Sequence, residues 1–494
     1  MKKRRLFLIL AAALLAAAAV AAALILGGER DALEDGSGSS VELVYYTIGD
    51  PDEDLELVNQ AINELLLERY GFTIDYRKLG WNEYEAYLTS LVNTHSGFDI
   101  AFTWTEGYQE NAVAGHWLDI TDYLSTEDFQ GLRSAVDERF WHGAAVGGRV
   151  YGVPTNKELA TPLHFLYSAE LVEKYGVDIE SYDSIASLEG VLEEVAAGES
   201  GCIPLFFDSS HVNLVATLGY EYAAYSDLPL VVRSGDSSCT VLNAFEQPDV
   251  LQLLDTLRRY YLLGYINQDA AIRSNLSRFD DERVFLRIAS GGPDSAASYS
   301  QTFGYPIVVH QSSESIVTSE STQGGIMAVN AYTAHPRECL VFLQALNTDP
   351  ELRNLFNYGI EGVHYTLTDS GQVHSISGGY TGVEYTQGNW FILRTREGER
   401  PDKWDVYREF NDEARESELL GFSPSYDGLE SQRQAVADLY QRYGSALFTG
   451  TVDPEIYVPR FLEELEAAGL DELQSALQSQ IDAFLTENKG DAVE

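Results

Sequence analysis

The fold class follows from residues 41–102, which read VELVYYTIGDPDEDLELVNQAINELLLERYGFTIDYRKLGWNEYEAYLTSLVNTHSGFDIAF. Three short runs in this stretch are rich in apolar, β-branched and aromatic residues, as buried strands are, and two longer runs repeat apolar residues every three or four positions, as helices do. The predicted strands are residues 41–48, 72–79 and 98–102, and the predicted helices are 53–70 and 82–94. Because strand and helix alternate, the sequence predicts a doubly wound α/β fold around a parallel sheet.

The loops after these strands are the expected ligand-binding positions, because ligands of such sheets bind beyond the carboxyl ends of the strands. The loop after the second strand carries Trp81, and the loop after the third carries Trp104 and Tyr108. Most aromatic residues in a chain with 30 tyrosines belong to the core or the surface. Position, rather than number, therefore makes these three residues candidates for solute contact.

The α/β pattern continues beyond residue 150. Strands are predicted at 163–167 and 203–207, and helices at 170–175, 187–197 and 249–263. Residues 290–300 are rich in Gly, Ser and Ala, which predicts a loop, whereas most of 402–485 is predicted to be helical. A chain of 494 residues is long enough for two lobes or domains.

The N-terminal segment has the pattern of an export element. Four basic residues, Lys2 to Arg5, precede an uninterrupted apolar run at 6–26, and a helix needs about 20 such residues to cross a bilayer. The basic flank predicts that the remainder of the chain is exported. Both an uncleaved anchor and a cleaved signal peptide fit, because the run is long for a signal but Ala21–Ala23 offers small residues for cleavage. Residues 29–40 are polar and rich in Gly and Ser, which predicts a flexible linker.

Composition excludes several classes of partner. The net charge is −45, so nucleic acids and anionic lipid surfaces would be repelled. The same charge makes the chain less suited to a polyanionic ligand such as a polyuronate, unless a local basic pocket overrides it. Acidic surface otherwise favours solubility, and it assigns no function by itself.

No enzyme motif is present. The sequence contains no His-Glu-x-x-His, no Gly-x-Ser-x-Gly and no phosphate-binding Gly-x-x-x-x-Gly-Lys pattern. Its nine histidines lack the spacing of metal ligands, so neither a metal nor a cofactor is expected. Three cysteines allow at most one disulfide, for which Cys202 and Cys239 are the better pair, although isolated cysteines are the simpler interpretation.

A helix with well-defined ends is predicted within Thr348–Tyr365, TDPELRNLFNYGIEGVHY. Asp349 is a favourable N-cap residue, and Pro350 fits the first helical position. Gly359 ends the helix, and the corner that follows presents the carboxylate of Glu361. A solvated loop between helix and strand is the alternative interpretation of this corner.

This stretch resembles the C-terminal half of carbohydrate-type ABC-transporter solute-binding proteins, in the branch of large bacterial lipoproteins with the signature YGIEG.HY. Other segments are similar to the same branch, and the resemblance covers nearly all of residues 41–490. These segments are FDIAFTWTEGYQENAVAGHWLDITDYL (98–124), GGRVYGVP (147–154), GGIMAVNAYTAHPRECLVFLQAL (324–346), GNWFIL (388–393), SELLGFSP (417–424) and AAGLDELQSALQSQIDAF (467–484). The family usually carries a lipobox cysteine after the apolar run, where this chain has Gly27 and Gly28, so a transmembrane tether would replace a lipid anchor.

The resemblance implies a two-lobed periplasmic-binding-protein-like fold of type II, with a hinge between the lobes and a helical C-terminal region. The chain would cross between the lobes near 151–154 and 325–329. The implied parts are a signal or anchor at 1–28, a linker at 29–40, a first lobe at 41–154 with 326–370 returning to it, and a second lobe at 155–325 with 371–494.

Sugar recognition needs flat apolar faces for the pyranose ring and planar polar groups for its hydroxyls. Asn330 and Glu361 lie in loops that the resemblance brings near the cleft, and Trp141 precedes a crossing strand. The full set of candidates for ligand contact is Trp81, Trp104, Tyr108, Trp141, Asn330, Glu361 and Trp390.

The implied function is that of the extracytoplasmic substrate-binding component of an ABC importer. The protein would capture a small solute, expected to be a sugar or oligosaccharide, and deliver it as a monomer to a membrane permease without chemical change. A surface-tethered glycan-active enzyme is one alternative. A binding protein for peptides or other polar solutes and a tethered sensor ectodomain are the others.

Overall fold

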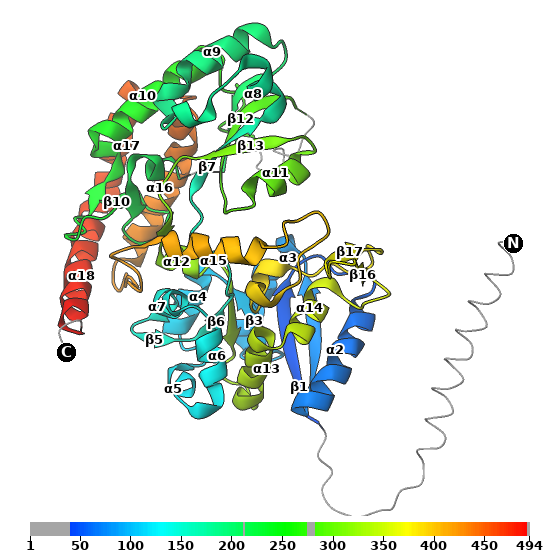
Figure 1. Ribbon diagram of the computed structural model, residues 1–494. Coiled ribbons are helices and arrows are strands. Elements are labelled where there is room, and N and C mark those ends of the chain that lie inside the picture. Colours follow the sequence, from blue (N-terminus) through cyan, green and yellow to red (C-terminus); the bar gives the residue numbers. More distant parts are fainter. Residues whose placement is uncertain (1–39, 211–212, 274–281, 492–494) are drawn as a thin grey trace, which may run out of the picture. The chain divides into compact units, whose positions relative to one another are not determined.

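The computed structural model describes residues 40–210, 213–273 and 282–491 (Figure 1). Residues 42–494 form one compact unit. The predicted anchor at 1–28 and all but the last residue of the predicted linker at 29–40 lie outside the described residues. Within the described ranges, no helix has the length and apolar composition needed to span a bilayer.

Five strands form the first sheet, in the order β2–β1–β3–β15–β6. They are β1 (Glu42–Ile48), β2 (Thr73–Leu79), β3 (Ile100–Thr103), β6 (Gly152–Pro154) and β15 (Ile326–Val329). The first three are parallel, as predicted, because α2 (Leu55–Tyr70) and α3 (Trp81–Thr94) provide the crossovers. β15 runs antiparallel to both of its neighbours, so the complete sheet is mixed. We call the part built on this sheet the first lobe.

Helices and two hairpins complete the first lobe. They are α4 (Thr105–Val113), α5 (Thr121–Leu124), α6 (Gln130–Ala135), α7 (Glu138–Gly143), the hairpin of β4 (Ala145–Val146) and β5 (Arg149–Val150), α13 (Pro336–Thr348), α14 (Pro350–Tyr358) and the hairpin of β16 (Tyr365–Leu367) and β17 (Val373–Ser375). The ends predicted for α14 are confirmed, since the Asp349 carboxylate accepts hydrogen bonds from the Glu351 and Leu352 N–H groups and Gly359 follows at φ 74°.

The second lobe is built on another mixed sheet, in the order β13–β7–β12–β8. Its strands are β7 (Leu163–Ser168), β8 (Ile203–Phe206), β12 (Val284–Ser290) and β13 (Ile307–Gln311), and its helices include α8 (Ala169–Tyr175), α9 (Glu189–Gly198), α10 (Pro248–Leu262) and α11 (Ser295–Phe303). The predicted loop at 290–300 is wrong beyond residue 294, because Ser and Ala, unlike the glycines at 291–292, continue readily into a helix. A smaller sheet, β9 (Tyr220–Tyr222), β10 (Leu230–Arg233) and β11 (Leu242–Asn243), contributes to the same hydrophobic core.

The C-terminal region is mostly helical, as predicted. Its helices are α15 (Lys403–Glu413), α16 (Glu430–Phe448), α17 (Pro454–Ala468) and α18 (Leu470–Asp491). Helices α16 and α17 pack on α10, α18 packs on α16 and α17, and all three join the second-lobe core. Residues from 373 to 407 instead share a small core with Tyr358 of α14, in the first lobe. The boundaries implied by the resemblance stay a prediction, and these contacts favour assigning 371–413 to the first lobe.

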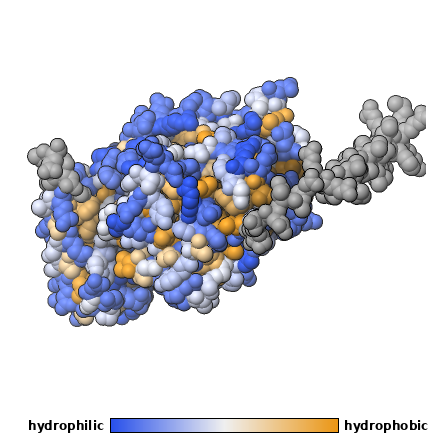
Figure 2. All heavy atoms as spheres, turned by 90° about the horizontal axis from the view of Figure 1, so that it is seen from below, coloured by the Kyte–Doolittle hydropathy of each residue, from blue (hydrophilic) through white to orange (hydrophobic). Residues whose placement is uncertain are grey.

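Three segments connect the lobes: residues 155–162 between β6 and β7, 312–325 between β13 and β15, and 414–429 between α15 and α16. The second and third meet where β14 (Ile316–Val317) pairs in parallel with β18 (Arg415–Glu416). On the face seen in Figure 2, hydrophilic residues predominate and hydrophobic residues form scattered patches, which agrees with the acidic composition.

Candidate functional site

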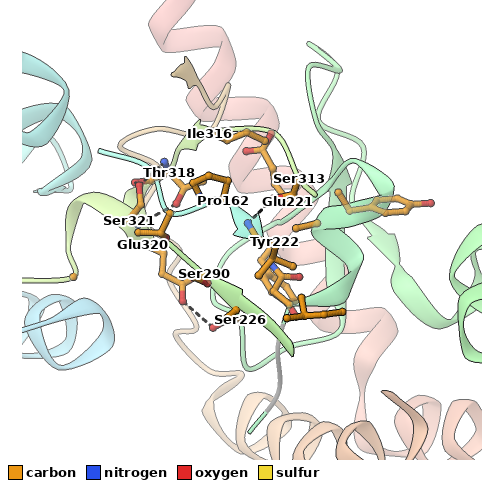
Figure 3. Close-up of a pocket in the computed structure, with 18 of the residues that line it drawn as sticks. Pro162, Glu221, Tyr222, Ser226, Ser290, Ser313, Ile316, Thr318, Glu320 and Ser321 are labelled. Carbon is orange, nitrogen blue, oxygen red and sulfur yellow. Dashed lines mark hydrogen bonds between the residues drawn. The ribbon is translucent and has the colours of Figure 1, made fainter. Parts of the chain in front are cut away.

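A cavity of about 880 Å³ opens beside the connecting segments (Figure 3). We call it the main cavity. Strands β7, β8, β9 and β12 and helix α11 of the second lobe line it, together with connecting residues such as Pro162, Thr318 and Ser321. Small-molecule sites in proteins measure about 300–1,000 Å³, so this volume is in the upper part of that range.

Two carboxylates in the main cavity are each held by an arginine through one oxygen only. Glu221 Oε1 accepts from Arg415 at 3.1 Å, and Asp227 Oδ2 pairs with Arg433 at 3.0 Å. The other oxygen of each is buried and, within the described residues, has no hydrogen-bond partner. Burial also raises the pKa of Asp227. Unused acceptors at a cavity wall are suited to a solute that donates hydrogen bonds.

Glu320 lies at one edge of the main cavity, where its carboxylate accepts a hydrogen bond from Ser226 at 2.9 Å (Figure 3). The Glu320 side chain is exposed within the cavity. Enough protein surrounds it, however, that the loss of solvation, together with the charge of Asp227, raises its pKa.

A second cavity, of about 510 Å³, adjoins the first. It lies between α3 and α4 of the first lobe and residues 225–227 of the second, and Trp104 lines it. Both cavities share Thr105, Ser226, Asp227 and Glu320. The two cavities therefore form one continuous site that is lined by both lobes.

Aromatic rings form a wall of the main cavity. The Arg287 guanidinium lies between Phe206 and Phe303, at 4.1 and 4.6 Å from the ring centroids, and Phe303 stacks on Tyr299 at 5.6 Å. Arg287 is 5% exposed, and burial lowers its pKa. The two rings stabilise this buried cation and are held in place by it.

The first lobe contributes a row of four aromatic residues at the carboxyl end of its parallel strands, which we call the first-lobe aromatic strip. Trp81 stacks on Tyr385 with ring centroids 6.1 Å apart, Tyr385 contacts Phe102 at 6.3 Å, and Phe102 contacts Trp104 at 5.6 Å. Trp81 is 57% exposed. The strip leads from this exposed ring to the adjoining cavity.

The backbone is strained where the strip meets the cavities. Thr105 has φ 36°, a conformation that β-branched residues rarely adopt. Its N–H donates to the Gln323 carbonyl oxygen at 3.0 Å, which helps to hold this geometry. Such strain is common at ligand-binding sites, and here it occurs in a residue that lines both cavities.

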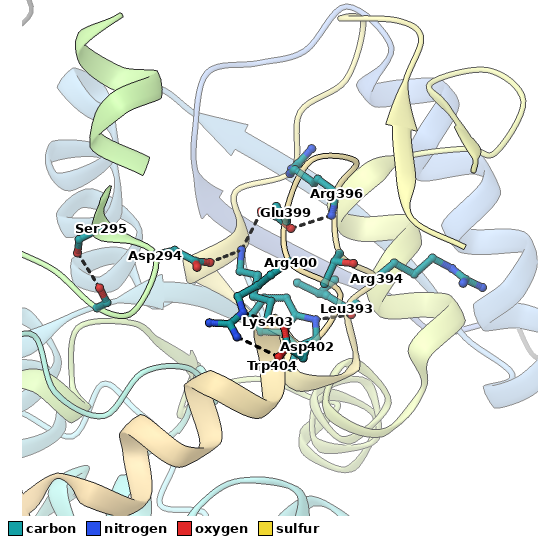
Figure 4. A network of polar contacts seen from close by, with 12 residues as sticks. Asp294, Ser295, Leu393, Arg394, Arg396, Glu399, Arg400, Asp402, Lys403 and Trp404 are labelled. Carbon is teal, nitrogen blue, oxygen red and sulfur yellow. Dashed lines mark hydrogen bonds and ion pairs between the residues drawn. The ribbon is translucent and has the colours of Figure 1, made fainter. Parts of the chain in front are cut away.

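Two polar networks join the lobes at the site. In one, the amide of Gln109 on α4 donates to Gln323 at 2.9 Å and accepts hydrogen bonds from Tyr225 of the second lobe and from Ser423 of a connecting segment. In the other, the Lys403 ammonium on α15 pairs with Glu399 at 2.9 Å and reaches Asp294 of the second lobe at 3.4 Å (Figure 4).

Comparison with known families identifies the chain. Residues 60–364 match the model described as bacterial extracellular solute-binding protein. This chain belongs to that family. Residues 418–486, which include α16, α17 and most of α18, also match a model described as a domain of unknown function (DUF3502). Membership of this family places the protein outside the cytoplasm and indicates that its function is to bind a solute.

Individual relatives of this solute-binding protein are moderately similar in sequence. A carbohydrate ABC transporter substrate-binding protein from Streptococcus pneumoniae is 26% identical over 94% of this chain and 95% of its own length. The crystal structure of the N-glycan transport solute binding protein NgtS from Streptococcus pneumoniae superposes with a TM-score of 0.82 at 27% identity, covering 91% of this chain and 100% of that one. Its complex with Man5GlcNAc gives a TM-score of 0.72 at the same identity, over 91% and 99% of the two chains. The two-lobed α/β fold is thereby confirmed.

The structure brings two of the seven predicted contact residues of this solute-binding protein together, since Trp81 and Trp104 both belong to the first-lobe aromatic strip. Trp390 is half-buried beside Trp404 and lies 6.0 Å from the ammonium of Lys157, which lines the main cavity. Glu361 is an exposed corner residue that lines neither cavity.

The other three predicted residues are part of the first-lobe core. Tyr108 is fully buried, and its hydroxyl donates to the Ala144 carbonyl oxygen at 2.8 Å. The Trp141 indole N–H donates to a carbonyl oxygen at 3.1 Å, and the Asn330 amide bridges two backbone groups. These contacts give the three side chains structural roles that sequence position did not reveal, and their part in solute contact stays a prediction.

Sequence reasoning missed the carboxylates of the cavities, Glu221, Asp227 and Glu320, and the aromatic residues Phe206 and Tyr385. None belongs to a motif, and the three carboxylates and Tyr385 neither lie in a predicted strand nor directly follow one. The only signal in the sequence was the position of Phe206 in a predicted strand, at 203–207. No group of three or more His, Cys, Asp or Glu side chains within the described residues could hold a metal ion, and no disulfide joins any two of the three cysteines.

Proposed function

We propose that this protein is the oligosaccharide-binding component of an ABC importer. The single observation that carries the proposal is the continuous site formed by the two cavities and the first-lobe aromatic strip. It offers flat apolar rings from one lobe and hydrogen-bond acceptors from the other. Pyranose rings present an apolar face and a rim of hydroxyl donors, which this combination fits.

The size of the site supports an oligosaccharide over a monosaccharide. The cavities measure about 880 and 510 Å³ and share four residues, and the strip extends the site beyond them. The solved relative that superposes on this chain was crystallised with Man5GlcNAc and with Man1GlcNAc. Mannose- and N-acetylglucosamine-containing oligosaccharides are therefore the first solutes to test.

Binding would close the lobes about the connecting segments. A solute in the site touches both lobes, so it stabilises whichever arrangement brings them together. The closed form would deliver the solute to membrane permease subunits. We further propose that the protein acts as a monomer, held at the outer face of the cytoplasmic membrane by its N-terminal segment, and that it does not alter the solute.

The test is titration calorimetry with residues 40–494, a range that contains the compact unit and its cores. Man1GlcNAc, Man5GlcNAc, maltotriose and a tripeptide are the solutes, and each is analysed by chromatography after the titration. We expect Man5GlcNAc to bind and to be recovered intact. Binding of the tripeptide alone would contradict the carbohydrate assignment, and a shortened glycan would indicate the enzyme instead.

A further inference from the structure

Glu221 occupies an unusual position in the main cavity. It lies on β9, is 7% exposed, and lines the cavity wall (Figure 3). Oε1 accepts from Arg415, whereas Oε2 is buried and has no partner within the described residues. A buried carboxylate oxygen without a partner costs free energy, so its retention at a cavity wall points to a partner supplied by the solute.

Arg415 fixes the direction of this carboxylate. Its guanidinium donates to Glu221 at 3.1 Å and pairs with Glu314 at 3.0 Å, so it joins two carboxylates that both line the cavity. Arg415 belongs to β18, whose pairing with β14 ties two connecting segments together. The arginine that holds Glu221 therefore belongs to the paired segments that connect the lobes.

The main cavity carries more negative than positive groups. Five carboxylates line it: Asp208, Glu221, Asp227, Glu314 and Glu320. The cationic side chains in its lining are Lys157, which pairs with Glu158 at 2.8 Å, and Arg287, which lies between two phenylalanine rings. The Nε and Nη1 atoms of Arg287 have no hydrogen-bond partner within the described residues, but the five carboxylates outnumber the two cations of the lining, and the whole chain carries −45. A negatively charged solute would be repelled, whereas hydroxyl groups would find acceptors.

We propose that Glu221 is a solute-binding residue that accepts hydrogen bonds from sugar hydroxyls, that Arg415 positions it, and that the site therefore selects uncharged oligosaccharides and rejects those that carry carboxylates. This inference rests on the proposed function and narrows its substrate class. It assigns the specificity to one side chain and to the sign of the surrounding charge.

The experiment compares matched glycans and matched variants of residues 40–494 by titration calorimetry. The glycans are Man5GlcNAc and a biantennary N-glycan with and without its terminal sialic acids, a pair that differs only in carboxylate-bearing residues. The variants are Glu221→Gln, Glu221→Asp, Arg415→Lys and Glu464→Gln. The last removes a carboxylate that an arginine holds on α17, outside the cavity lining, and serves as the control for charge alone.

For the unsubstituted protein, we expect the sialylated glycan to bind at least about tenfold more weakly than its asialo form at low salt, with a smaller ratio at high salt because charges are screened. Glu221→Gln should weaken neutral glycan binding by about tenfold to a hundredfold and reduce that ratio. Glu221→Asp should weaken binding but keep the ratio, because the charge remains while the oxygens withdraw from the solute. Arg415→Lys should weaken binding less than Glu221→Gln, and Glu464→Gln should change neither quantity.

Each contrary outcome overturns a defined part. If no neutral glycan binds the unsubstituted protein, the proposed function fails and this inference fails with it. If neutral glycans bind and Glu221→Gln binds them equally well, the role of Glu221 alone is wrong. Equal affinity for the sialylated and asialo forms would refute the charge selection. Thermal unfolding of each unliganded variant identifies any loss of binding that comes from misfolding. If Glu221→Gln does not fold, the smaller change, Glu221→Asp, decides whether Glu221 binds the solute.

Discussion

The exposed ring of Trp81 permits a quantitative prediction for solute affinity. A tryptophan side chain can bury up to about 250 Å², so 57% exposure leaves roughly 140 Å² free in the unliganded protein. A sugar ring stacked on one face would cover about half of this, or roughly 70 Å², which is worth about 1.8 kcal/mol at ~25 cal/mol per Å². Trp81→Ala should therefore weaken oligosaccharide binding by about 20-fold.

Tyr332→Ala is the matched control for this substitution. Tyr332 is 59% exposed and contacts the His95 ring at 4.3 Å, much as Trp81 stacks on Tyr385. It follows the carboxyl end of β15, which runs antiparallel to β3, so it lies at the opposite edge of the sheet. Calorimetry with Man5GlcNAc should show the loss for Trp81→Ala only. An unchanged dissociation constant for Trp81→Ala, or equal losses in both variants, would refute the stacking argument.

Three further predictions concern the framework. Gly152→Ala places a Cβ 2.5 Å from a side-chain carbon of β15, so it should lower the free energy of unfolding, measured by calorimetry, by about 1–3 kcal/mol. In the control, Gly190→Ala, the added Cβ meets no atom within 4 Å, and the free energy of unfolding should not fall. Equal effects of the two substitutions would contradict this account. Hydrogen bonds from a lysine and a tyrosine lower the pKa of Glu199 from its ordinary 4.5 to about 2, so this stabilisation is present above pH 4.5 and lost towards pH 2. Glu199→Gln should make urea unfolding less dependent on pH in this window, and an unchanged profile would be inconsistent with the ion pairing. Burial raises the pKa of the Cys202 thiol to about 11 and raises that of the Cys339 thiol further. A maleimide should therefore label both thiols much faster in urea than in buffer at pH 7.5. Rapid labelling of the folded protein would contradict their burial.

Local sequence patterns were sufficient to predict the strands and helices. Residues 41–102 alternate between two periodicities, and each run forms the element that was predicted. A helix or strand that buries one face needs apolar residues at the repeat of that face, which is 3.6 residues in a helix and 2 in a strand. The ends of α14 were equally readable, since Asp349 and Gly359 act through local hydrogen bonds and backbone conformation. The failure at 295–303 has the same origin: a helix of small residues has no apolar stripe to read.

The site was less predictable because it depends on contacts between distant segments. Trp81 and Trp104 could be found, since both directly follow strands of the parallel sheet. Tyr108 follows the same strand but points into the core, where its hydroxyl bonds a backbone 36 residues away. Glu221 could not be found, because its role depends on Arg415, which lies 194 positions along the chain.

Burial and pairing distinguish the few functional carboxylates that composition hides. Among 77 acidic residues, some pair will always be close together, so proximity of two carboxylates carries no information about function. Most acidic side chains in this chain are exposed to solvent, where an unpaired oxygen costs little because water satisfies it. At Glu221 and Asp227 one oxygen is buried and has no hydrogen-bond partner within the described residues, while an arginine holds the other. A donor that enters the cavity would offset the cost of that arrangement, and a sugar hydroxyl is such a donor. The same two residues would be poor partners for a carboxylate-bearing solute, so affinity for neutral glycans and rejection of anionic ones follow from one arrangement of side chains.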